Sequence, residues 1–419
     1  MALINEETDK FMNYRYSISE FTIITDKNIE VQPFQIVDIS IENNFESDLF
    51  PLFKVSLIID PPTYYSIIKN KNTVKFKIRI QKYSQPILSN EKSLKTDYIN
   101  DTFSIFLDDS DEQFDENIYK KRQSTDGYKD DEVSLFEYSN KIDLYLFKDI
   151  YVTNINKTVN KIVVSSNLTT VLAWLLSQGG LTNALVSPLD NRNTYSPLIL
   201  PPQNVMKTIR YLDNQYGFYK NGALIFFGVD RPYILNYKGG CTAWVTDEWK
   251  ETNMLISTQG GEYGESTGAL IRGEEKKFYI NLKDRDIRIT NNSIVNNVLG
   301  GTNAYTIDGF NDSNSESAST ANVKDSNMQH IIVNDWQNKF LGTTFAAQNS
   351  ANSVVISTTV SDINIEALAP NKQVSFIFED TKLTQKYKGI YRISSSFIKF
   401  TKDGEDFSTD VSCSFKKVG

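Results

Sequence analysis

The 419-residue chain has very few of the residues that bind transition metals or form disulfides. It contains one histidine, His330, and two cysteines, Cys241 and Cys413. A structural zinc site takes four His or Cys ligands, which this chain cannot supply without carboxylates. One cysteine pair is no disulfide framework either, so free thiols are expected. Glycine-rich nucleotide-binding loops are also missing. The sequence therefore predicts neither a metal nor a cofactor.

Long apolar runs and a basic leader are missing as well. No apolar stretch approaches the ~20 residues that span a bilayer, and the start MALINEETDKF lacks the pattern of a secretory signal. We expect cytosolic synthesis and no membrane insertion. With 44 basic against 52 acidic residues, the net charge is −8. This negative charge argues against a protein whose main role is to bind nucleic acid by neutralising phosphates. It would suit a surface past which DNA moves without binding.

Aromatic residues are abundant, with 22 tyrosines and 25 phenylalanines, and they favour strands. The clearest predicted strand is Thr73–Gln81, where apolar and basic residues alternate. Such alternation predicts one buried and one solvated face. The basic face is either ordinary solvated sheet or a docking face for an acidic partner. The buried set is Val74, Phe76, Ile78 and Ile80, and the solvated set is Lys75, Lys77, Arg79 and Gln81.

Three segments look peripheral. Residues 1–20 are polar, and residues 84–131 are an acidic interruption. The acids at 108–116 lack the central glycine of a calcium loop, so a solvated loop is expected. Residues 308–328 are rich in Ser, Asn and Asp and cannot bury enough apolar surface to order themselves, which predicts a long mobile loop.

The stretch 168–235 organises the rest of the chain. Apolar residues at helical spacing predict a helix from Leu168 that ends at Gly179-Gly180. Pro201-Pro202 is predicted to open a second helix, since proline suits a first turn. Lys220-Asn221-Gly222 then predicts a hairpin turn before the strand Ala223–Phe227.

The C-terminal region predicts a hairpin, Tyr391–Phe400 and Phe407–Phe415 around the turn Asp403-Gly404, with Cys413 as a small buried apolar residue. Residues 354–378 also repeat the plan of the stretch before Ile78: a strand, a short helical link, Asn-Lys and an alternating strand. The match is short and needs a one-residue gap. It fits two tandem β domains, with Thr73–Gln81 and Gln373–Glu379 in equivalent places.

One segment matches the nucleophile elbow of serine hydrolases. Gly264-Glu265-Ser266-Thr267-Gly268 fits G-x-S-x-G, and acids followed by His330 come later in the order of such a triad. The elbow requires a buried strand before it and a helix after it, whereas both flanks are glycine-rich. Ser266 is therefore expected in a loop, and no catalytic residue is assigned. The candidate acids are Asp308, Asp312 and Asp325.

The order Leu198 to Pro202, then a helix, then Tyr211 to Tyr219 resembles the middle segment of baseplate hub proteins of contractile-tailed bacteriophages and related injection machines. The region Gly389–Ile393 shares the resemblance. A helix packed on a hairpin in any α+β protein is the alternative. The residues that carry the motif, in structural roles, are Pro201, Pro202, Tyr211, Leu212, Asp213, Tyr216, Gly217, Phe218 and Tyr219.

The resemblance implies an α+β, mainly β fold: two tail-tube-like β-barrel domains plus a small helix-hairpin middle domain. The expected boundaries are 1–155 for the first β domain with its insertion 84–131, 156–257 for the middle domain, and 258–419 for the second β domain with the loop 308–328.

The function implied is that of a structural, non-enzymatic virion protein. It would be a homotrimer, made in the host cytoplasm, at the centre of a tail baseplate. There it would join the six-fold tail tube to a three-fold spike and pass DNA at ejection. Its partners would be the tail tube protein, the central spike protein and other baseplate proteins. The alternatives are a hub or spike protein of a type VI-like or extracellular injection system, a tail tube or distal tail protein, a serine hydrolase using Ser266, or an ordinary α+β binding protein.

Overall fold

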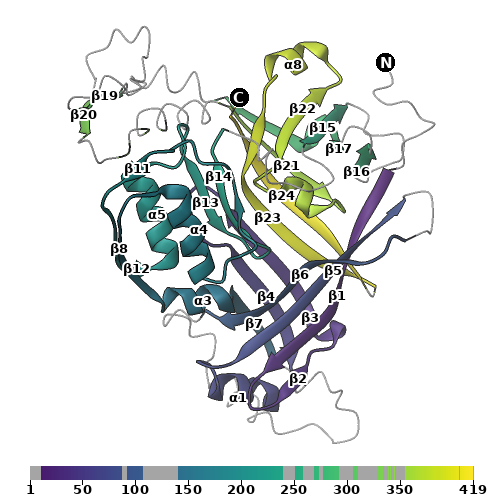
Figure 1. Ribbon diagram of the computed structural model, residues 1–419. Coiled ribbons are helices and arrows are strands. Elements are labelled where there is room, and N and C mark those ends of the chain that lie inside the picture. Colours follow the sequence, from purple (N-terminus) through teal and green to yellow (C-terminus); the bar gives the residue numbers. More distant parts are fainter. Residues whose placement is uncertain are drawn as a thin grey trace, which may run out of the picture.

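The computed structural model describes residues 11–86, 92–106, 140–238, 251–257, 269–272, 277–291, 305–309, 329–333, 338, 340, 344, 354–404 and 406–418. They form a mainly β molecule with a group of helices at one side (Figure 1). The N-terminal elements are β1 (Phe11–Ile24), β2 (Asn28–Glu30), η1 (Pro33–Gln35), β3 (Ile36–Asn44), β4 (Leu52–Ile59), α1 (Pro61–Lys69), β5 (Lys75–Pro86), β6 (Thr96–Ile105) and β7 (Asn140–Lys148).

A middle unit and the C-terminal elements follow. The middle unit has α3 (Asp149–Ile155), β8 (Thr158–Val163), β9 (Ser166–Asn167), α4 (Leu168–Gln178), β10 (Leu185–Val186), β11 (Thr194–Tyr195), β12 (Leu198–Asn204), α5 (Val205–Tyr216), β13 (Ala223–Phe227) and β14 (Pro232–Asn236). The remainder has β15 (Glu251–Ser257), β16 (Ala269–Arg272), β17 (Lys277–Lys283), η4 (Asp284–Asp286), β18 (Ile287–Asn291), β19 (Tyr305–Gly309), β20 (Gln329–Val333), β21 (Val354–Ser361), η5 (Ile365–Leu368), β22 (Gln373–Phe378), α8 (Thr381–Lys386), β23 (Tyr391–Asp403) and β24 (Asp406–Lys417).

The first barrel is closed by strands from opposite parts of the chain. Its pairing order is β23–β3–β4–β7–β6–β5–β1–β24, and β23 pairs with β24 to complete the ring. Antiparallel β3 meets β23 over Ile39–Asn44, and β1 meets β24 at Tyr16. The C-terminal hairpin is therefore part of the N-terminal barrel.

The second group of strands is built on the other half of the same hairpin. Tyr391 of β23 pairs with β22, which continues through β15 and β17 to β16. Residues Asp410–Lys416 of β24 pair with β21, and β21 pairs with β18. Because one hairpin serves both groups, the closed barrel and the second group of strands share β23 and β24, and in Figure 1 the yellow hairpin runs diagonally between them.

The weak sequence repeat corresponds to a repeated strand topology. In the first copy β3 pairs β4, β4 pairs β7, and β5–β6–β7 follow in the sheet. In the second, β18 pairs β21, β21 pairs β24, and β22–β23–β24 follow, all antiparallel as in the first. Phe76 and Phe376 are both buried, as predicted. The copies differ on one side, since β5 lies antiparallel to β1 whereas β22 lies parallel to β15.

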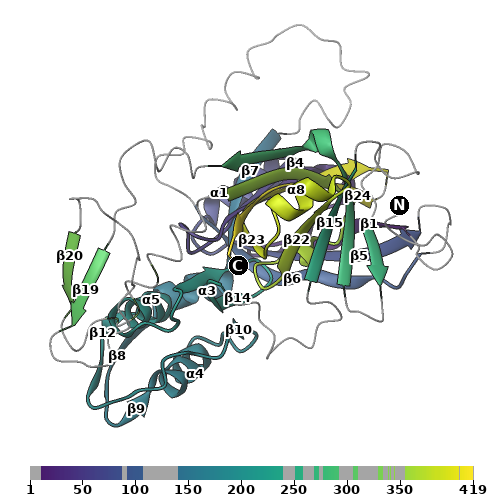
Figure 2. The same cartoon turned by 90° about the horizontal axis from the view of Figure 1, so that it is seen from above.

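The middle unit has its own apolar core. Helices α4 and α5 pack together, and α5 also packs on the ribbon formed by β8 and β12. Asn167 and Asn204 cap the two helices by accepting hydrogen bonds from Thr170 and Lys207, respectively. Seen from above, α4 and α5 lie beside the strands of the large sheet (Figure 2). The predicted domain boundaries stay a prediction.

Two predictions about the middle unit were wrong. Pro201-Pro202 do not begin α5; they lie in β12, at the register shift between Leu200 and Gln203 where the ribbon is irregular. Proline has no N–H to donate, so a bulge tolerates it, and the helix starts at Val205 behind its Asn204 cap. Nor does the Asn-Gly turn join two paired strands, because β13 pairs with the following strand, β14.

Two segments predicted to be peripheral contain barrel strands. Residues 11–20 belong to β1, with Tyr14 and Tyr16 buried. The interruption 84–131 contains β6, which pairs along β5 and buries Ile99 and Phe103. Neither strand was recognised, because polar residues separate their apolar ones.

β15 lies within the range predicted for the middle domain, and its pairing partners belong to the second group of strands. β15 pairs with β17 and β22. Its alternating Met254 and Ile256 are buried in the large apolar core.

Several other predictions are confirmed. Val74, just before β5, is buried, and so are the alternating residues on the strand, Phe76, Ile78 and Ile80. β23 and β24 form the expected hairpin, and Cys413 is a buried free thiol whose pKa is raised by that burial. The calcium-loop candidate and almost all of segment 308–328 lie outside the described residues.

Candidate functional site

The motif residues lie together at the C-terminal end of α5. Leu212 is completely buried between the helices of the middle unit, while Tyr211 and Tyr216 are half-buried on the same helix. Phe218 and Tyr219 follow the helix and are buried in the same core. The ring of Tyr216 lies 4.6 Å from that of Tyr195 on β11. The structure thus brings these residues together, apart from the two prolines, which lie on the preceding strand.

Asp213 and Gly217 shape the turn that ends the helix. The carboxylate of Asp213 accepts a hydrogen bond of 2.9 Å from the N–H of Phe218. Burial raises the pKa of Asp213 to about 6, an effect that this hydrogen bond and Arg210 partly offset. Gly217 has φ +69°, and a Cβ there would lie 2.1 Å from Oδ1 of Asn338. Only glycine fits this turn without strain.

Buried polar side chains lock the turn to the rest of the unit. The amide nitrogen of Asn191 donates to the carbonyl oxygens of Tyr216 (2.7 Å) and Gly217 (2.9 Å). The hydroxyl of Tyr219 lies within hydrogen-bond distance of the carbonyl oxygens of Ser187 (2.8 Å) and Ile234 (3.0 Å), which share its one proton. Buried polar groups are normally paired in this way. These bonds hold the turn against the rest of the unit.

A polar junction, formed by Glu46, Tyr237, Arg392 and Lys416, joins the middle unit to the first barrel and to the hairpin β23–β24. Arg392 on β23 is 5% exposed and donates to the carbonyl of Tyr237 at 2.6 Å. The hydroxyl of Tyr237 donates to Glu46 at 2.8 Å, and Lys416 forms an ion pair with the same carboxylate. Glu46 lies in the loop after β3, so the polar junction links three units through charge-assisted bonds. No motif or spacing in the sequence predicts this junction.

A cleft of about 660 Å³ lies where the three units meet. Lys82 of β5 forms an ion pair with Glu366 of η5 and donates to Asn364 at 3.2 Å. The middle unit contributes Asp230 and Arg231 to the same wall. Acidic and basic side chains both line the cleft, and Lys82 and Glu366 pair across it. The lining therefore has no single sign of charge that would select a charged ligand.

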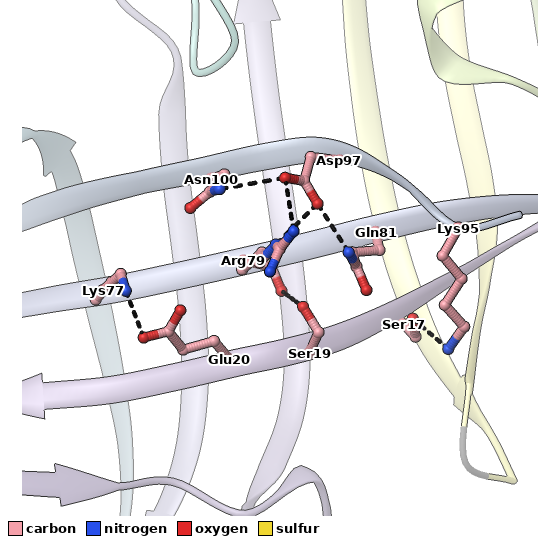
Figure 3. Close-up of polar contacts among 9 residues, drawn as sticks. All are labelled: Ser17, Ser19, Glu20, Lys77, Arg79, Gln81, Lys95, Asp97 and Asn100. Atoms are coloured by element: carbon pink, nitrogen blue, oxygen red, sulfur yellow. Dashed lines mark hydrogen bonds and ion pairs between the residues drawn. The ribbon is translucent and has the colours of Figure 1, made fainter.

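The basic face of β5 is paired within the chain (Figure 3). Arg79 forms a bidentate ion pair with Asp97 of β6, at 2.8 and 3.0 Å, and lowers the pKa of that carboxyl. Lys77 forms an ion pair of 2.7 Å with Glu20 of β1. Lys75 pairs with Asp149. Of the two predicted alternatives, this pairing favours an ordinary solvated sheet.

The hydrolase candidates are mostly outside the described residues, which hold only Asp308 and His330 of the proposed set. These two lie on the paired parallel strands β19 and β20, where His330 is opposite Thr306. Within the described ranges, no cluster of three or more His, Cys, Asp or Glu residues could hold a metal ion. In the same part of the chain, no helix combines the length and apolarity needed to cross a membrane.

A sequence profile of one protein family matches residues 3–418. The chain is therefore a bacteriophage protein. It belongs to the family described as Bacteriophage PBS1 gene 109 protein. No curated protein matches the chain.

Solved structures of tail proteins are similar to the chain at low identity. The 43 kDa tail protein of prophage MuSo2 from Shewanella oneidensis is 11% identical, with 94% of this chain and 96% of that chain covered and a TM-score of 0.44. The tail protein from Neisseria meningitidis MC58 is 10% identical, with 97% of each chain covered and a TM-score of 0.47. The E. coli c3393 protein, described as a type VI secretion component similar to T4 tail proteins gp27 and gp5, is 6% identical, with 99% of this chain and 76% of that chain covered and a TM-score of 0.38. At these TM-scores the likenesses assign no role to this chain.

Proposed function

We propose that the protein is a structural component of a phage tail, the central hub of its baseplate, and that it acts as a homotrimer without enzymatic activity. In this role it joins a six-fold tail tube to a three-fold spike and passes DNA at ejection. Its partners are the tail tube protein, the spike protein and other baseplate proteins. Membership of a bacteriophage family and the motif around Tyr211–Tyr219 support the assignment.

The repeated strand topology is the observation that carries the proposal. Each chain contributes two groups of strands with the same order around β4 and β21. Three chains in a closed ring then offer six similar units to a six-fold neighbour, and cyclic symmetry leaves no interface unpaired. One gene thereby resolves the mismatch between a six-fold and a three-fold structure.

The polar junction and the shared hairpin support a mechanical role. A hub must transmit force between its neighbours without separating into domains. Arg392 and Lys416 on the hairpin bind the middle unit and the first barrel at once. The net charge of −8 suits a lumen that repels DNA phosphates and lets them pass.

The test is the native mass of the purified protein, measured by light scattering at micromolar concentration. The expected value is three times 47.8 kDa. A monomer or a dimer under these conditions would contradict the proposal. Cryo-electron microscopy of tails that carry a tagged copy should then place three copies at the tube–spike junction, and a position along the tube would support a tail tube protein instead.

A further inference from the structure

The ribbon formed by β8 and β12 exposes aliphatic side chains on one of its faces. Ile162 of β8 and Ile199 of β12 are direct partners across the ribbon, and they are 64% and 48% exposed. Val164, just after the end of β8, is 69% exposed. On the opposite face, Leu198 and Leu200 are completely buried in the core of the middle unit. One face of the ribbon therefore builds the core, and the other leaves an apolar patch (Ile162, Val164 and Ile199) in water.

The ribbon lies on the side of the middle unit away from the large sheet. Figure 1 and Figure 2 both place it at the outer margin of this unit, with α4 and α5 on its inner side. Helix α5 packs on both of its strands. Exposed apolar residues that cluster within a polar rim are typical of interaction sites.

The rim of the apolar patch is basic, although the whole chain has a net charge of −8. Residues 157–167 and 192–204, which include β8, β9, β11 and β12, contain three basic residues and no acidic one. Lys157 precedes β8, Lys161 is next to Ile162, and Arg192 precedes β11. Positive charge therefore lies at both ends of the ribbon and beside its apolar patch.

These basic residues differ from those of the first barrel in having no acidic partner. On β5, Lys77 is paired with Glu20 at 2.7 Å. Among the described residues, no carboxylate pairs with any of the three basic side chains of the ribbon. The ammonium of Lys161 instead lies 4.6 Å from the ring centroid of Trp174. The ribbon thus keeps positive charges that the carboxylates of a partner could neutralise.

We propose that the apolar patch and its basic rim form a docking surface for an acidic segment of another tail protein. An apolar centre within a polar rim is the usual anatomy of a protein interface. DNA would neutralise the charges but leave Ile162 and Ile199 in water. A second copy of this chain suits the surface less, because barrel acids such as Asp97 and Asp143 are already paired. The inference rests on the proposed role in a tail, where such a partner would be present.

Photo-cross-linking in assembled tails tests the docking surface. Benzoylphenylalanine replaces Ile162 in the full chain, and in a control it replaces Lys69, an exposed residue of α1, which lies away from the ribbon (Figure 1). Each variant complements a phage that lacks the gene, and the purified tails are irradiated and analysed by peptide mass spectrometry. The Ile162 variant should attach to a peptide rich in Asp and Glu from a different tail protein. The Lys69 variant should not give this product.

Two substitutions of Arg192 test the contribution of charge. The Arg192 side chain makes no bond to another described residue, so its replacement should leave the melting temperature unchanged. Combined with the photoreactive residue at position 162, Arg192→Glu should lower the yield of the product several-fold, and Arg192→Lys should preserve it. Equal yields from the two variants would overturn the proposal, because the charge would then play no part in binding.

The other outcomes of the cross-linking also overturn the proposal. A product with a peptide of this same chain means that the chain or a second copy covers the patch. A product with DNA means that the ribbon binds nucleic acid. Tails with three copies at the tube–spike junction but no product at position 162 leave the proposed function intact and remove the docking surface. Tails that lack the chain altogether contradict the proposed function as well.

Discussion

Tyr16 and Phe400 pack edge to face inside the first barrel, with ring centroids 5.5 Å apart. Tyr16 is on β1 and Phe400 is on β23, so the contact joins the first and last long segments of the chain. Both side chains are almost completely buried. The hydroxyl of Tyr16 also accepts a hydrogen bond of 3.0 Å from the N–H of Ile365, which brings η5 into the same core.

Replacing Phe400 with alanine should therefore lower the free energy of unfolding of the first barrel. Loss of a buried phenylalanine typically costs about 3–5 kcal/mol. Phe397→Ala is the control, since Phe397 is on the same strand but 42% exposed. Urea denaturation of both variants measures the difference. Equal midpoints for the two variants would mean that the hairpin is not part of the core.

Leu212→Ala should destabilise the middle unit by about 2–5 kcal/mol, because it leaves a cavity between α4 and α5. Gln215, an exposed residue on the same helix, provides the control. Its replacement by alanine should leave the melting temperature nearly unchanged. If the Leu212→Ala variant has the same melting temperature as wild type, Leu212 is not packed in the core of the middle unit.

Gly217→Ala and Gly404→Ala separate backbone strain from steric conflict. Both glycines have φ near +67°, at +69° and +66°, but a Cβ on Gly404 would meet nothing within 4 Å. Gly404→Ala should thus cost only the left-handed strain of about 1–2 kcal/mol. Gly217→Ala should cost clearly more, and adding Asn338→Ala should recover part of the excess, because the ring of Phe340 would also lie 3.0 Å from the new Cβ. Equal losses of stability would rule out the contact with Asn338.

Asp213 should make folding stability depend on pH. Its pKa of about 6 in the folded protein exceeds the ~3.9 of an unfolded aspartate. The folded state then retains a proton that the unfolded chain releases, so stability falls as the pH rises from about 4 to about 6. Asp213→Asn removes this contribution.

Denaturation of wild type and Asp213→Asn across pH 4–8 checks this. The stability of the variant relative to wild type should increase by about 1–3 kcal/mol over the window and stay constant above it. A flat difference would mean that the carboxyl is not desolvated. A difference of opposite sign would mean that the Phe218 hydrogen bond outweighs burial.

The elements predicted correctly are those whose residues interact with residues close to them in the sequence. The alternation of β5 and the turn at Asp403-Gly404 depend on local geometry, and both are present. β1 was missed because its buried positions hold Tyr14 and Tyr16 beside polar residues, and a register shift between Ile18 and Glu20 interrupts its alternation. The start of α5 was misplaced because proline fits a bulge as well as a first turn.

The polar junction could not be predicted for a different reason. Arg392 and Tyr237 interact through a side chain and a backbone carbonyl that are far apart in the sequence. Neither residue type nor spacing distinguishes this arginine from a solvent-exposed one. Only the fold shows that it is buried, and the same holds for Asn191 below the turn at Gly217. Contacts between segments far apart in the chain therefore could not be predicted from this one sequence.

The shared hairpin also sets the order in which the protein can fold as it is synthesised. A ribosome releases β1 through β7 long before β23 and β24, yet the first barrel has no closed ring without that hairpin. Until residue 417 has emerged, the edge of β3 stays open, and open strand edges promote aggregation. A nascent chain of this protein would therefore depend on rapid completion or on chaperones, and a fragment that ends at residue 155 would never close its barrel.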